Sequence, residues 1–208
     1  MIIAIDGAST DLSIAVAEPN GTFLAEEGWS SAQRQSAELL PRLIGLLERE
    51  GRSLHDASAI VIGTGPGSFT GLRVAMALAK GLAVGLGLPI VGVPSLAAWL
   101  DAEPVAGAAL ARAGAREAYL LARGELEPGI VDRDALGGEA TVVAPAELAA
   151  SFGLRDARPP RAAAAMARAA SRRLASEPRG DDPSTLEPIY LRAPRGAAAE
   201  SGEGVKWL

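Results

Sequence analysis

A glycine-rich loop between an apolar run and a long helical pattern most constrains the fold of this chain. Residues 60–63 read Ile-Val-Ile-Gly, which is typical of a buried strand, and residues 70–86, closed by a glycine and then a proline, are typical of a helix. The loop that joins them reads GTGPGSFTG, residues 63–71. Because strand, loop and helix follow one another here, we expect an α/β fold with helices packed on a mixed sheet.

The segments around this loop complete the expected sheet. Three β-rich runs open the chain, and Pro-Asn-Gly between the last two predicts a hairpin turn, because Asn and Gly tolerate positive φ. The next helix has its leucines on one face, and Ser95 can cap a later one. The expected ranges are 2–5, 13–17 and 22–26 for the first strands, 36–50 for the helix and 90–93 for a later strand.

The pattern weakens after residue 100 into Ala, Gly and Arg. Runs at 105–110 and 117–122 predict a second hairpin, 160–177 predicts an alanine-rich helix, and 186–192 predicts one more strand. We therefore expect an N-terminal lobe over residues 1–100, a smaller second lobe over 101–186, and a C-terminal strand and tail over 187–208.

Backbone amides of a glycine loop at a helix N-terminus can hold a phosphate, but this loop fits neither standard phosphate-binding pattern. A P-loop needs a lysine after its last glycine, and here Leu72 and Arg73 follow Gly71. A dinucleotide-binding loop needs a third glycine where this chain has Ser68. The alternative is a tight turn in which Ser68 or Thr70 caps the helix and Phe69 packs on the sheet or on another chain.

The helix after the loop is apolar nearly all round, so it must be covered. Ala75, Ala79 and Ala83 form one stripe with Gly81 and Gly85 nearby, which allows another backbone to approach closely. The side that its own sheet leaves open is covered either by another subunit or by the second lobe.

Residue counts exclude several kinds of chemistry. The chain has no cysteine and a single histidine, His55, so it has no disulfide, no thiolate metal site, no cysteine nucleophile and no metal site with two histidines. We therefore expect no metal-binding residue, and catalysis is limited, since a Ser-His-Asp triad would have to use His55. The net charge is −5, from 20 basic and 25 acidic residues, so any RNA contact is local or shared with a partner.

The apolar start of the chain has no basic residue and is typical of a buried strand rather than a signal peptide. The longest apolar stretch, 74–88, contains Lys80 and several glycines and is too short for a membrane span. We expect a cytoplasmic protein with no membrane contact.

The glycine loop also carries a family resemblance. The sequence GPGSFTGLR at residues 65–73, followed by AKGLA at 79–83, resembles the signature of the TsaB (YeaZ) family. Shorter matches agree in order: AID at 4–6, LLP at 39–41, and EPIYLR at 187–192 with a late Trp207. The resemblance is strong over residues 1–100, thin over 101–186, and resumes near the C-terminus.

This resemblance implies a two-lobed actin-like fold of the acetate kinase, Hsp70 and actin type, related to ribonuclease H. It implies a non-catalytic scaffold that binds and activates TsaD, together with the ATPase TsaE, for threonylcarbamoylation of the adenosine beside the tRNA anticodon. It further implies a homodimer when the chain is alone, tRNA contact only through the complex, and ATP or ADP only within that complex. The catalytic relative holds its metal with two histidines on a helix, whereas this chain has only His55.

The chain departs from the family pattern at two residue positions and in an abbreviated second lobe. Gly7 and Ala8 follow Asp6 where the family has a small hydroxyl residue, and Gln35 stands where relatives often carry a histidine. In folds of this kind the strand-1 carboxylate serves metal or phosphate, but it can also cap the following turn. The residues of a possible vestigial nucleotide site are Asp6, Ser9 and Thr10.

We expect helices 36–50 and 70–86 to form an association face for TsaD or a second copy. Arg73 and Lys80 can bind an anion or a partner's carboxylate, or lie on a solvated stripe.

The rival to the scaffold function is an autonomous actin-fold nucleotide-binding enzyme or small-molecule kinase, which requires ATP affinity in the chain alone. Arginines of 160–177 face either tRNA or solvent. The association face of helices 36–50 and 70–86 would comprise Leu39, Leu40, Leu43, Phe69, Leu72, Arg73, Met76, Ala79 and Lys80. It lies beside the loop residues Gly65, Pro66, Gly67, Ser68, Thr70 and Gly71.

Overall fold

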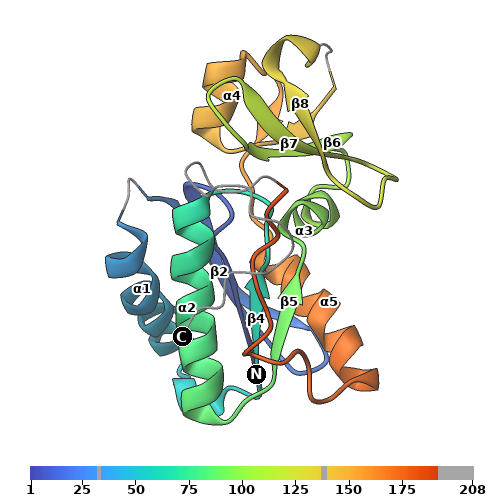
Figure 1. The fold of residues 1–208 in the computed structure, drawn as a ribbon. Coiled ribbons are helices and arrows are strands. Elements are labelled where there is room, and N and C mark those ends of the chain that lie inside the picture. The colour runs from blue at the N-terminus through green and yellow to red at the C-terminus, as the bar shows by residue number, and fades with distance from the viewer. Residues whose placement is uncertain (32–33, 137–139, 192–208) are drawn as a thin grey trace.

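Two five-stranded sheets organise the chain into two lobes (Figure 1). The structure is a computed structural model that describes residues 1–31, 34–136 and 140–191. The first sheet has the strand order β3-β2-β1-β4-β5 and the second the order β10-β9-β6-β7-β8. The first order, with β1, β2 and β3 antiparallel and β4 and β5 parallel to β1, is that of the actin-like, ribonuclease H-like class.

The strands of the first sheet follow the expected ranges closely. The opening meander is confirmed, and Gly21 has the positive φ of 84° that its turn requires. Every residue of β1 is buried, as in a strand covered on both faces. The bounds are β1 Ile2–Asp6, β2 Asp11–Ala17, β3 Phe23–Ser30, β4 Ala59–Gly63 and β5 Ile90–Val93.

Alternate residues of these strands pack into two separate cores, because successive side chains point to opposite faces of a sheet. Ile3 and Ile5 lie in the core beneath α1, Gln35–Arg49, and α2, Phe69–Leu86. Ile2 and Ala4 lie in the core beneath α3, Ser95–Ala102, and α5, Ala163–Ser176. The helices therefore cover opposite faces of the first sheet (Figure 1).

The second lobe is built on the hairpin of β6 and β7, which confirms the predicted second hairpin. Its core is small and contains Leu110, Ala118, Leu148 and Phe152. The chain then returns to the first lobe as α5, which packs on β1 and β2 although it falls within the expected second lobe. The remaining bounds are η1 Leu54–Asp56, β6 Ala108–Arg112, β7 Glu117–Ala122, β8 Gly129–Asp132, η2 Arg133–Ala135, β9 Val142–Val143, α4 Ala146–Phe152 and β10 Ala157–Arg158.

Two local predictions are wrong. Residues 186–191 form no strand: Pro188 has no N–H to give to a ladder, and the segment is tied to the first sheet by one bond, from the Ile189 amide to the Thr64 carbonyl, at 2.8 Å. Arg192 and Trp207 lie outside the described residues. Ser95 does not cap its helix, because Pro94 holds the N-cap position and the Ser95 hydroxyl is bonded elsewhere.

Helix α2 is long and apolar enough to cross a membrane by length and composition alone, with a mean hydropathy of 1.4 over its 18 residues. In this fold it packs on β4 and α1, and a third of its length is buried. Its apolar character is accounted for partly by this packing and partly by an exposed face.

Adjacent leucines of α1 provide a test of the core. Leu39 is 1% exposed and Leu40 is 39% exposed. We expect Leu39→Ala to lower the free energy of unfolding by roughly 2–5 kcal/mol, because it leaves a cavity in a packed core. Leu40→Ala is the matched control and should change it by less than about 1 kcal/mol. Chemical denaturation of both variants measures the difference; equal losses would contradict the placement of α1.

Candidate functional site

The glycine loop packs against the turn between β1 and β2. The Ser68 amide donates to the Ala8 carbonyl at 2.7 Å, and a side chain at Gly67 would collide with that same carbonyl. The Ser68 hydroxyl accepts from the Gly71 amide at 3.2 Å, which confirms Ser68 as a cap of α2. Gly65 has a φ of 87°, which favours glycine. The Ser68 amide, one that a phosphate would use, is thus already bonded within the chain.

Asp6 lies at the end of β1 and is almost completely buried, at 1% exposure. Its carboxylate accepts hydrogen bonds from the Ser95 hydroxyl at 2.8 Å and the Trp99 indole at 2.6 Å, both from α3. The Ala8 amide is a third donor, at 3.3 Å, so Asp6 also caps the following turn. Burial raises the pKa of the Asp6 carboxyl above its usual range, against the lowering effect of these donors. Trp99 and Ser95 therefore seal this carboxylate inside the first lobe.

A cleft of about 530 Å³ opens between the two lobes. Ser9 and Thr10 line it together with the glycine loop, so the structure brings these predicted residues together while Asp6 is absent from the lining. The Ser9 hydroxyl is engaged with the backbone of Asp11, at 2.8 and 3.0 Å. The lining residues are Ala8, Ser9, Thr10, Gly67, Ser68, Phe69, Arg112, Ala113, Gly114, Tyr119, Pro145, Glu147, Leu148 and Tyr190.

An aromatic and cationic cluster lies where the cleft meets α2. The Arg73 guanidinium carbon stands 3.7 Å from the centroid of the Phe69 ring, and the Phe69 and Tyr190 centroids are 5.6 Å apart. The Arg73 Nε also donates to the Tyr190 hydroxyl at 3.1 Å. Phe69 nevertheless remains 40% exposed. This cluster joins the C-terminal segment to the first turn of α2.

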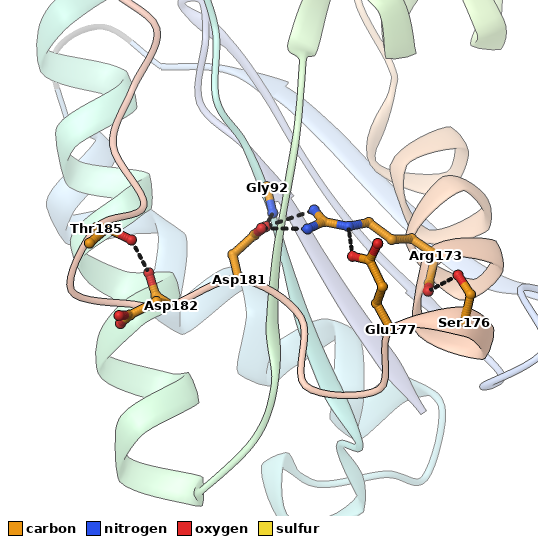
Figure 2. Close-up of polar contacts among 7 residues, drawn as sticks. All are labelled: Gly92, Arg173, Ser176, Glu177, Asp181, Asp182 and Thr185. Atoms are coloured by element: carbon orange, nitrogen blue, oxygen red, sulfur yellow. Dashed lines mark hydrogen bonds and ion pairs between the residues drawn. The ribbon is translucent and has the colours of Figure 1, made fainter.

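A partly buried ion pair between Arg173 and Asp181 holds that C-terminal segment against β5 (Figure 2). Asp181 accepts two bonds from the Arg173 guanidinium, at 2.9 and 2.6 Å, and one from the Gly92 amide at 2.8 Å. Partial burial raises the pKa of the Asp181 carboxyl, but these donors outweigh that effect and hold the pKa below its usual range. The pair is therefore ionised at neutral pH and fixes the path from α5 to Tyr190.

The predicted association residues divide into two groups in the structure. Five lie in the chain's own core and four lie at the surface. Exposed or half-buried are Leu40, Phe69, Arg73 and Lys80, whereas Leu39, Leu43, Leu72, Met76 and Ala79 are buried. The stripe of Ala75, Ala79 and Ala83 faces the first sheet, so it serves packing within the chain.

The exposed face of α2 consists of residues that the sequence analysis did not select as a set. Ala77, Gly81, Val84 and Gly85 are all exposed, and Val84 is 69% exposed. Their spacing of i, i+4, i+7 and i+8 is that of one helical face, which is the signal that identifies them. A side chain at Gly81 or Gly85 would meet no atom within 4 Å. Here another backbone can approach α2 closely.

His55 lies in the short helix η1 and is exposed, as expected for a loop residue. The helical arginines Arg161, Arg168 and Arg172 are exposed on α5 or just before it, on the opposite side of the first sheet from α2. Neither His55 nor these three arginines line the cleft.

Comparison with known proteins adds to this geometry. The family model described as "TsaD: tRNA N6-adenosine threonylcarbamoyltransferase" matches residues 30–179. The tRNA threonylcarbamoyladenosine biosynthesis protein TsaB of Escherichia coli is 40% identical over 96 residues, 46% of this chain and 40% of that protein. TsaB of Bacillus subtilis is 38% identical over 95 residues, 46% of this chain and 41% of that protein. The chain belongs to the TsaB (YeaZ) family.

Two further likenesses extend over most of the chain. An uncharacterized protein of Mycobacterium tuberculosis is 30% identical over 203 residues, 93% of this chain and 92% of that protein. YeaZ from Pseudomonas aeruginosa has the same fold, with a TM-score of 0.66 and 22% identity over 91% of this chain and 99% of that one. The chain spans less than half the length of the two named TsaB proteins in these alignments.

The sealed carboxylate generates a prediction about stability. Asp6→Ala leaves the Trp99 indole N–H and the Ser95 hydroxyl buried without their acceptor, so we expect the free energy of unfolding to fall by roughly 2–4 kcal/mol. Asp101→Ala, at an exposed position of α3, is the matched control and should change it by less than about 0.5 kcal/mol. Denaturant titration measures both. An Asp6→Ala variant as stable as the unsubstituted chain would show that the carboxylate has no structural role.

Proposed function

We propose that this chain is a non-catalytic scaffold subunit for threonylcarbamoylation of the adenosine beside the tRNA anticodon, and that it binds and activates a TsaD-type catalytic subunit. Membership of the TsaB family supports the pathway, since relatives of this family are named for tRNA threonylcarbamoyladenosine biosynthesis. The proposal assigns no catalytic, metal-binding or cofactor-binding residue to the chain itself.

The observation that carries this proposal is the exposed face of α2. Glycines at 81 and 85 let a second helix approach closely, and Val84 adds exposed apolar surface. Leu40 of the neighbouring helix α1 is also exposed and apolar, and Arg73 and Lys80 provide charge on α2. A face of small and apolar residues with charges beside it suits a protein partner.

The burial of the Asp6 carboxylate supports a role other than phosphoryl transfer. A kinase of this fold needs its strand-1 carboxylate in the cleft, whereas Asp6 is bonded to Ser95 and Trp99 beneath it. The Ser68 amide of the glycine loop is bonded to Ala8. Both features favour a scaffold over the autonomous nucleotide-binding enzyme.

A TsaD-type partner fits because the chain itself matches the TsaD family model over residues 30–179. Two chains of related fold can pair through equivalent faces, so one α2 face serves both a homodimer when the chain is alone and a heterodimer with the catalytic subunit. The proposed assembly is cytoplasmic, includes the ATPase TsaE, and holds ATP or ADP only within the complex.

Gly81→Arg separates association from folding. Because Gly81 lies in a helix with open space beside it, arginine should raise the free energy of unfolding by about 0.5–1 kcal/mol. The same side chain projects into the space that a partner helix would occupy, so pull-down of the TsaD-type subunit should be lost. The measurement is pull-down with purified proteins together with chemical denaturation.

Ala150→Arg, at an exposed position of α4 in the second lobe, is the control for adding an arginine and should keep the pull-down. Pull-down retained by Gly81→Arg would defeat the proposal. Ala79 is unsuitable for this test, because it is buried and a larger side chain there costs about 1–3 kcal/mol in the chain's own core. Arg73→Glu also disturbs contacts within the chain, to Phe69 and Tyr190.

A further inference from the structure

Three arginines follow one side of the last helix of the first lobe. Arg168 and Arg172 are one helical turn apart on α5, about 6 Å along its axis, and Arg161 lies just before the helix begins. All three are exposed. We call these three residues the α5 arginine stripe.

Most arginines of the chain are paired, and those of the stripe are not. Within residues 1–31, 34–136 and 140–191, Arg161, Arg168 and Arg172 form no ion pair or hydrogen bond. Arg179, after α5, and two arginines of the second lobe, Arg133 and Arg155, share this condition. Arginines with an acidic partner are Arg34, Arg42, Arg49, Arg52, Arg112, Arg116, Arg158 and Arg173.

The Glu26 carboxylate interacts electrostatically with Arg161 and Arg168, and it is already engaged in a hydrogen bond. Glu26 of β3 accepts a hydrogen bond from the Ala164 amide at 3.1 Å, where it satisfies the first turn of α5. Burial raises the pKa of the Glu26 carboxyl, although the charges of Arg161 and Arg168 act in the opposite direction. Glu26 carries at most one negative charge against three arginines, so these four side chains together have an excess of positive charge.

The excess is local, because the chain as a whole carries a net charge of −5. An acidic protein repels a polyanion everywhere except where its basic groups gather, so the stripe orients such a partner as well as attracting it. Guanidinium groups bind phosphate oxygens through paired N–H donors, and one helical turn is close to the spacing of successive phosphates along a nucleic-acid strand.

We propose that the α5 arginine stripe contacts the phosphate backbone of RNA. This inference rests on the proposed function, which makes tRNA the RNA in question, and it adds a direct contact from this chain to one otherwise made through the complex. Helix α5 covers the face of the first sheet opposite α1 and α2 (Figure 1). The stripe therefore stays open when the α2 face is occupied by a protein partner.

The test compares two pairs of unpaired, exposed arginines that change the net charge equally. Arg168→Gln with Arg172→Gln removes two residues of the stripe, and Arg133→Gln with Arg155→Gln is the matched control in the second lobe. Each is assembled with the TsaD-type subunit, and its binding to a labelled, unmodified tRNA transcript is followed by fluorescence anisotropy over about 50–200 mM salt.

We expect the stripe pair to bind tRNA about tenfold more weakly, and the slope of log affinity against log salt to shrink by about 1.5, as for two lost phosphate contacts. The control pair should stay within about twofold of the unsubstituted complex. Lysines at 168 and 172 keep the charge and should restore most of the affinity.

Pull-down of the TsaD-type subunit keeps this inference distinct from the proposed function. Both arginine pairs should retain it, because they lie away from α2. The inference is overturned if neither pair weakens tRNA binding, if both weaken it equally, if the unsubstituted complex binds no tRNA, or if the stripe pair loses the pull-down. If the unsubstituted chain does not pull down the TsaD-type subunit, the scaffold proposal itself is refuted.

Discussion

The buried Asp6 carboxylate is the interaction on which the first lobe depends. It joins the end of β1 to α3 through Ser95 and Trp99, and it holds the turn that places Ala8 under the glycine loop. Removing a carboxylate from water is costly, and the three donors offset that cost only in this arrangement. The strand-1 carboxylate, which the family resemblance associates with metal or phosphate, is here a structural element that holds β1, α3 and the following turn together.

With Asp6 buried in the first lobe, we propose that this lobe presents two functional surfaces on opposite sides of one sheet. Helix α2 presents small and apolar residues at Gly81 and Val84, which suit a closely packed protein partner. Helix α5 presents unpaired arginines, which suit a polyanion. The ion pair of Arg173 with Asp181 anchors the segment that leaves α5 (Figure 2). This segment continues to Tyr190, which packs on Phe69 beside α2. A scaffold that brings an enzyme and its RNA together needs both surfaces.

Much of the fold could be predicted from the sequence, because its first hundred residues have clear periodicity and clear turn residues. The orientation of α2 could not, since a helix apolar on most sides gives no sign of which alanines face the sheet. In the structure Ala79 is buried and Ala77 is exposed, and the sequence does not distinguish the two. The partners of Asp6 were also out of reach: Ser95 and Trp99 lie 89 and 93 residues away, and only the folded chain brings them together. The β-like composition of residues 186–191 was misleading because Pro188 cannot join a ladder.

The central claim is that this chain contributes an association face and no active site. Reconstituted synthesis of threonylcarbamoyladenosine on tRNA, with TsaD-type and TsaE-type subunits, tests it most directly. The account predicts product with the unsubstituted chain, little without it, and little with Gly81→Arg although that variant is well folded. Product formation that proceeds equally well with Gly81→Arg, or with the chain omitted, would contradict it.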